Sequence, residues 1–179
     1  MDKLNLDDLK NGFFGLSKNI GAFLAEAAMI CLDLNNHSTG TILNLSGFSE
    51  KSFILDWTDE VTPELSNSWK DLKEATEYGA TALAALLIFP ISGMVITGRV
   101  PQAEQSDYVL QKPGNYNKNS TLPEAFLEVS GILNEKAGNT INMRVEKKKR
   151  HIQQGALRNY PTYIIVIEFG IPQSQIAKI

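Results

Sequence analysis

SDYVL at residues 106–110 and AFLEVSG at residues 125–131 are the two short segments from which the fold is read most directly. Both suit β-strands, in which successive side chains point to opposite faces of the sheet. On that period Phe126, Glu128 and Ser130 share one face. Asp107 has the apolar Val109 on its own face. A carboxylate among apolar neighbours is costly unless it has a partner or an ion, so the two acids are candidate functional residues.

The flanking sequence predicts a mixed sheet with helices on its faces. A helix over about 68–89, ending at Pro90, precedes a strand at 94–100. A strongly basic helix from 139 to about 157 and a buried strand at 163–169 follow the two segments. The predicted order is therefore helix, strand, strand, strand, helix, strand. Antiparallel neighbours and then a helical crossover to a parallel strand give an α/β fold.

The N-terminal part predicts a separate extension of this core. Apolar residues at three- and four-residue spacing indicate a helix over 16–35. Two strand-like runs, 41–45 and 52–57, indicate a hairpin. We therefore expect residues 1–66 to form a helix and hairpin packed on a core of residues 67–179. The polar residues 58–67 and 111–122 are interpreted as a connector and an exposed loop.

Together these segments resemble the PD-(D/E)XK nuclease superfamily, also called restriction-endonuclease-like. The resemblance covers roughly residues 67–169 and rests on the helix and strand order, with Asp107 on the second strand and Glu128 on the third. It implies an αβββαβ core and metal-dependent hydrolysis of a phosphodiester in nucleic acid, with DNA as the expected substrate. It also implies that Asp107 and Glu128 hold Mg²⁺ or Mn²⁺. Glu77, on the first core helix, matches a further acid that many members carry there, and we expect Gly79 and Ala80 to let that helix approach the sheet.

One departure concerns the cation of the family's Glu-X-Lys tripeptide. Here the tripeptide is Glu128-Val129-Ser130, and a serine supplies no charge. Some members carry the lysine on the following helix, and Arg144 and Lys148 would share one face of that helix. Lys148 is therefore the predicted replacement and a candidate catalytic residue. The residues expected to contact nucleic acid are Arg144, Lys147, Lys149, Arg150, His151 and Gln153.

The proposed chemistry is intelligible from the residues alone. Phosphodiester hydrolysis is helped by a divalent ion that polarises the phosphoryl oxygen and lowers the pKa of the attacking water. Magnesium takes one or two carboxylates and keeps several waters. The only histidines are His37 and His151, which leaves little for a histidine-based site. Glu168 lies inside an apolar run and is interpreted as structural, with Arg144 or Arg158 as its partner.

Composition limits the alternatives. A chain of 179 residues with 43% hydrophobic and 21% charged residues is ordinary for one globular domain. The net charge of −3 offers no global attraction for nucleic acid, so binding would need a local basic patch. The single cysteine, Cys31, excludes an internal disulfide and fits a reducing cytoplasm. The N-terminus lacks the basic segment followed by an apolar segment that is typical of a signal peptide.

Residues 79–97 contain no charge and are about as long as a membrane span. Pro90 and Gly93 interrupt them, so we favour a buried helix followed by a buried strand, and no membrane.

Other interpretations stay open at this point. The chain can be a binding module on the same fold without catalysis, for example in bacterial or phage defence, or an interaction domain unrelated to nucleases. Asp107 could be a surface acid, and Glu128 could pair with a helix lysine without any metal. The basic run 147–150 could be a solvated helix face. The helix at 16–34 could form a homodimer face if its apolar residues are exposed.

Overall fold

The protein is described by a computed structural model, which covers residues 1–179 except 14, 102–105 and 117–121. It forms an eight-stranded mixed sheet in the order β1-β3-β2-β8-β7-β6-β5-β4. The strands are β1 (Asp2–Asn5), β2 (Thr41–Gly47), β3 (Lys51–Asp56), β4 (Val95–Arg99), β5 (Tyr108–Gln111), β6 (Ala125–Ile132), β7 (Thr162–Glu168) and β8 (Gln173–Lys178).

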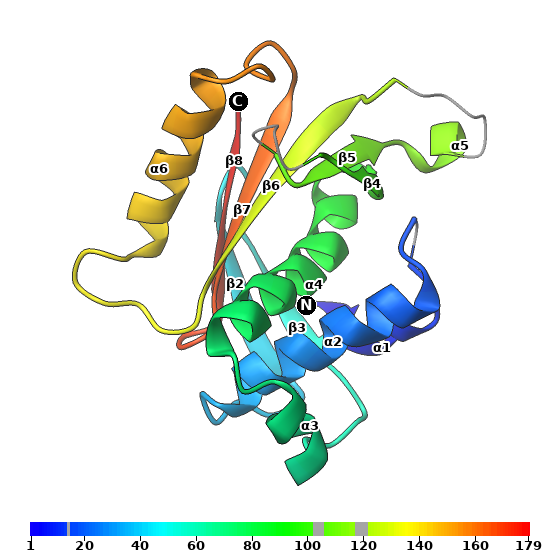
Figure 1. The fold of residues 1–179 in the computed structure, drawn as a ribbon, viewed down its shortest axis with the longest axis vertical. Coiled ribbons are helices and arrows are strands. Elements are labelled where there is room, and N and C mark those ends of the chain that lie inside the picture. Colours follow the sequence, from blue (N-terminus) through cyan, green and yellow to red (C-terminus); the bar gives the residue numbers. More distant parts are fainter. Residues whose placement is uncertain (14, 102–105, 117–121) are drawn as a thin grey trace.

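Helices cover both faces of the sheet (Figure 1). On one face, α2 (Lys18–Asp33) and α4 (Leu72–Ser92) pack against each other, and α4 packs on β6 and β7. On the other face, α6 (Ile141–Gln153) packs on β7 and β8. Three short helices, α1 (Leu6–Lys10), α3 (Pro63–Ser68) and α5 (Pro113–Tyr116), complete the described elements. The α/β class with a mixed sheet flanked by helices is confirmed.

The second part of the chain has the expected element order. α4 is followed by β4, β5 and β6, then α6 and β7. β4 pairs antiparallel with β5, β5 pairs antiparallel with β6, and β6 pairs parallel with β7. α6 is thus the crossover between two parallel neighbours. Asp107, however, lies in a bend just before β5 and not inside the strand.

The N-terminal hairpin continues this same sheet. β2 and β3 are antiparallel as expected, and β2 pairs parallel with β8. β8 pairs antiparallel with β7, so it links the hairpin to the rest of the sheet. The sequence prediction contains neither β8 nor β1. The segment 58–67, predicted as a connector, contains most of α3. Of the predicted loop 111–122, residues 113–116 form α5, and 117–121 lie outside the described residues.

α4 is the central helix of the core, and its end differs from the prediction. Asp71 caps its start by accepting from the backbone N–H groups of Lys73 and Glu74. The helix continues through Pro90 and ends at Gly93, whose φ of 69° is the left-handed conformation that glycine adopts at low cost. Two-thirds (67%) of its most apolar 18-residue window is buried. Length and composition alone would allow this helix to span a membrane, but here it fills a globular core and β4 follows it, as expected.

Close backbone contact fixes α4 against β6. A Cβ at Gly131 would lie 2.3 Å from the carbonyl oxygen of Thr76, so only glycine allows this approach. Gly79, expected to serve this purpose, instead faces α2, where a Cβ would lie 3.0 Å from the Ala27 carbonyl oxygen. The contact positions the first half of α4 beneath the end of β6.

Candidate functional site

The candidate site forms where β5 and β6 separate. Their ladder ends at the pair Tyr108 and Leu127, whereas β6 continues to Ile132 beside β7. The Asp107 backbone N–H still donates to the Leu127 carbonyl at 3.0 Å. Beyond it, the Asp107 carboxylate takes the place of a backbone acceptor, since Val129 N–H donates to Asp107 Oδ2 at 2.8 Å. The bend therefore turns one carboxylate toward the open edge of β6.

Glu128 brings a second carboxylate to the same place. Leu127 and Val129 belong to the core under α4, so Glu128 points to the face that α6 covers. Its side chain is only 6% exposed, and it forms an ion pair with Lys148 of α6. Burial first and the nearby Asp107 charge second raise the pKa of Glu128 to about 7, although Lys148 opposes both effects. The effect of the Asp107 charge on this pKa means that the two carboxyl groups lie near each other.

α6 supplies two cations to this region. Thr140 caps its start by accepting from Met143 N–H, and its buried face consists of Ile141, Val145 and Ile152. Beside that face, Lys148 forms an ion pair with Glu128, which is the contact expected in the interpretation without a metal, and its catalytic role stays a prediction. Arg144 reaches Ser130 instead, donating from NH1 to its Oγ at 3.1 Å. At the position of the expected third-strand lysine, the chain therefore has Ser130, and the positive charge comes from Arg144, which is hydrogen-bonded to this serine.

Asp107, Ser130, Arg144 and Lys148 line one cavity of about 550 Å³, and the buried Glu128 lies behind this lining. Asp107 and Glu77 line it, as do four basic residues. The basic residues are Lys73, Lys136, Arg144 and Lys148. The walls come from the start of α4, the end of β6, the segment after β6 and one side of α6. A volume of this size lies in the range of small-ligand sites.

Glu77 lies on the cavity wall, but no contact joins it to the acid pair. It is exposed on α4, and the structure records no ion pair or hydrogen bond of its side chain among the described residues. Glu77 thus lies at the edge of the site, and its predicted role stays a prediction.

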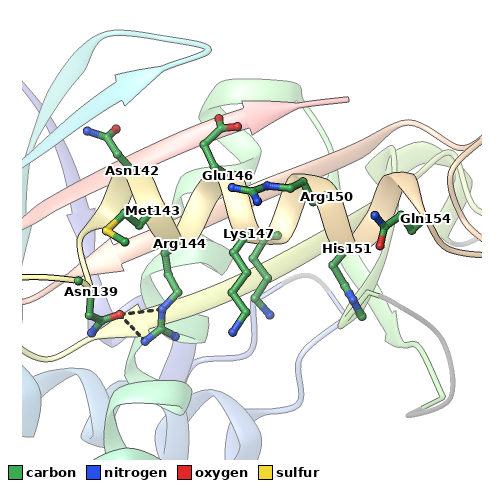
Figure 2. A pocket seen from close by; sticks show the side chains of 11 residues that line it. Asn139, Asn142, Met143, Arg144, Glu146, Lys147, Arg150, His151 and Gln154 are labelled. Atoms are coloured by element: carbon green, nitrogen blue, oxygen red, sulfur yellow. Dashed lines mark hydrogen bonds between the residues drawn. The ribbon is translucent and has the colours of Figure 1, made fainter.

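The basic residues of α6 divide between two sides of the helix (Figure 2). Arg144, Lys147 and His151 point to one side, whereas Glu146 points to the other. Lys149 pairs with Glu146 at 2.7 Å, and Gln153, four residues further, shares that side. Arg150 is exposed. The residues predicted to contact nucleic acid therefore lie on more than one side of α6, because 3.6 residues per turn place Lys149 and Gln153 away from the acid pair, and their role stays a prediction.

The donors at this site fit a hard divalent cation. Two carboxylates lie near each other, and burial first and the Asp107 charge second raise the pKa of Glu128. Within the described part of the chain, no group of three or more His, Cys, Asp or Glu side chains could hold a metal. A cation here would keep several water ligands, which is the habit of Mg²⁺.

Several features of the site were absent from the sequence prediction. Asn139 accepts from Arg144 Nε at 3.0 Å and from NH2 at 2.8 Å. Lys73 of α4 and Lys136 of the segment after β6 also line the cavity, and neither lysine is among the predicted site residues. The one signal in the sequence is the position of Asn139 at the start of the predicted helix.

The buried Glu168 plays no part in the site. Its carboxylate accepts from the backbone N–H groups of Gly170 at 2.7 Å and Ile171 at 2.8 Å. Neither Arg144 nor Arg158 is its hydrogen-bond partner, so that expectation is wrong, although the structural interpretation of Glu168 agrees with these bonds.

In comparisons with known proteins, no family model, no curated protein sequence and no solved structure matches this chain.

Proposed function

We propose that this chain is a metal-dependent nuclease with a restriction-endonuclease-like core, acting on a phosphodiester of DNA. The observation that carries the proposal is that Asp107 lies near Glu128, that Lys148 pairs with Glu128, and that Asp107 and Lys148 line a cavity together with further cations. Two acids and a lysine are a suitable set for holding a divalent ion and a phosphate together. The order from α4 to β7 supports the same family resemblance.

Each residue has a role that its surroundings favour. Asp107 and Glu128 would hold Mg²⁺ or Mn²⁺, which supplies charge stabilisation at the phosphoryl group when bound. Lys148 neutralises Glu128 in the free protein and is close enough to stabilise charge that develops on the phosphate. Glu77, exposed on the cavity wall, would assist through metal-bound water.

DNA would approach along one side of α6. Arg144, Lys147 and His151 point to that side, next to Lys148. Contacts of this kind attract phosphates without reading bases, so affinity should fall steeply with salt.

We also propose that the protein lies in the cytoplasm. Burial raises the pKa of the Cys31 thiol to about 12, so this thiol would be unreactive there.

A binding module without catalysis is the second candidate. It is favoured by Ser130 at the position of the usual lysine and by the ion pair that already occupies Lys148. Such a protein would bind DNA along α6 without hydrolysing it.

Nicking of supercoiled plasmid in Mg²⁺ or Mn²⁺ tests the proposal. We expect cleavage by the wild type and a loss of at least about a hundredfold in Asp107→Asn, because removing one group that stabilises the transition state costs that much. The asparagine side chain can still accept from Val129 N–H, so the fold should persist. Lys149→Gln, on the other side of α6, is the matched control and should cleave normally. DNA binding without metal-dependent cleavage by the wild type would instead support the binding module.

A further inference from the structure

Arg144 is held more firmly than a surface arginine. Asn139 Oδ1 accepts from its Nε and its NH2, and Ser130 Oγ accepts from its NH1. A guanidinium has five N–H donors, so two remain for a ligand. In the described part of the chain, no carboxylate forms an ion pair with Arg144.

This arrangement leaves a fixed positive charge on the cavity wall. Asn139 and Ser130 are neutral, so they orient the guanidinium without neutralising it. Lys136 and Lys73 line the same cavity and add to the positive potential. A planar guanidinium with two free donors suits the oxygens of a phosphate, and an orientation fixed in advance reduces the entropic cost of binding.

The position of Arg144 relative to Lys148 indicates which phosphate it would take. The two residues are four apart on one helix, which corresponds to about 6 Å along the axis. That is comparable to the distance that one nucleotide spans in an extended strand. Lys148 lies at the acid pair, so Arg144 lies about one nucleotide away from it.

We propose that Arg144 is a second phosphate-binding site, which holds the phosphate next to the one at the acid pair. The inference rests on the proposed function for the identity of the strand, but the anion site itself depends only on Arg144, Asn139 and Ser130. The cavity then recognises one strand by two successive phosphates, and Arg144 fixes the register of that strand against Asp107 and Glu128.

Short thymidine nucleotides test this site without cleavage. With Ca²⁺ replacing Mg²⁺, the affinities of TpT, pTpT and TpTp are measured by competition against a fluorescent oligothymidylate. TpT has one phosphate, and the other two add a second at the 5′ or 3′ end. We expect one of these two, according to strand direction, to bind the wild type about tenfold more tightly than TpT.

Variants separate Arg144 from general attraction between charges. In Arg144→Gln the gain from the second phosphate should fall to about onefold. Lys149→Gln also removes one positive charge from α6, but on the other side of the helix and outside the cavity lining, and should keep the gain. Ser130→Ala keeps the charge and frees NH1, so the gain should lie between the two, which provides a test even if Arg144→Gln does not fold.

Each outcome has a definite meaning. Equal wild-type affinities for the three nucleotides, or an unchanged gain in Arg144→Gln, would overturn the second site while plasmid cleavage remained a separate result. An Arg144-dependent gain without any plasmid cleavage would keep the anion site and remove the hydrolase. Absence of binding by all three nucleotides would overturn the second site as well.

Discussion

Lys148 and Glu128 form an ion pair across the interface between α6 and β6, with the carboxylate 6% exposed and the lysine side chain 28% exposed. The Glu128 carboxylate is thus shielded from water, whereas the Lys148 side chain remains in contact with water. Removing the lysine would leave a buried charge without compensation, which costs more than the intact pair contributes. The ion pair can therefore be tested through the stability of the protein, without an assay of activity.

Replacing Lys148 should destabilise the protein through Glu128. At pH 8 we expect Lys148→Met to lower the free energy of unfolding by about 2 kcal/mol, a value reduced from that of a fully buried pair because the lysine is partly exposed. Adding Glu128→Gln should recover most of the loss, because no charge is then left unpaired. Urea unfolding of both single variants and the double variant measures this coupling. Additive effects would mean that the two side chains do not interact in solution.

Stability should depend on pH through Glu128. The pKa of Glu128 is raised from 4.5 in the unfolded chain to about 7 in the folded protein, so the folded state holds a proton that the unfolded state has lost. The free energy of unfolding should therefore fall as pH rises from about 4.5 to about 7, by roughly 3 kcal/mol at most. Glu128→Gln should remove this decline, whereas Glu146→Gln, an exposed acid of α6, should retain it. An unchanged slope in Glu128→Gln would show that other groups cause it.

The face of Glu128 could be predicted because a strand has a period of two. Leu127 and Val129 had to enter the core, and this fixed the direction of Glu128 and Ser130. A contact between Glu128 and a lysine of α6 could also be predicted, because the basic helix follows β6 directly in the chain. By contrast, the sequence prediction does not assign the charged residues of α6 to separate sides of the helix. Lys149 was therefore grouped with Arg144 although it pairs with Glu146 on the other side.

The missed elements have physical reasons. β8 reads QSQIAK, in which only Ser174 and Ile176 are buried, so its apolar pattern is too weak to indicate a strand. It is held by neighbours on both sides, β7 and β2, which the local sequence does not reveal. The end of α4 was placed at Pro90, but the left-handed Gly93 and its N–H bond to Phe89 determine the end. The role of Asn139 depends on a side chain five residues away in the folded helix.

Two replacements of Asp107 separate its hydrogen bond from its charge. Asparagine and alanine both remove the negative charge beside Glu128, but only asparagine can still accept from Val129 N–H. We expect Asp107→Ala to be about 1–3 kcal/mol less stable than Asp107→Asn, because a buried donor is left unpaired. Chemical denaturation of both variants at one pH gives the difference. Equal stabilities would mean that water or a backbone shift satisfies Val129.

Gly131 should tolerate no side chain, because it sets the distance between α4 and β6. A Cβ there would lie 2.3 Å from the Thr76 carbonyl oxygen, and backbone cannot rotate away as a side chain can. We expect Gly131→Ala to lower the free energy of unfolding by about 3 kcal/mol, the cost of overpacking a core contact. Gly114→Ala is the control, since a Cβ there meets nothing within 4 Å and the change should be within about 0.5 kcal/mol. Because Glu77 follows Thr76 on α4, a shifted helix would also move the cavity wall away from Asp107. A Gly131→Ala protein as stable as the wild type would contradict the close packing of α4 on β6 on which that wall depends.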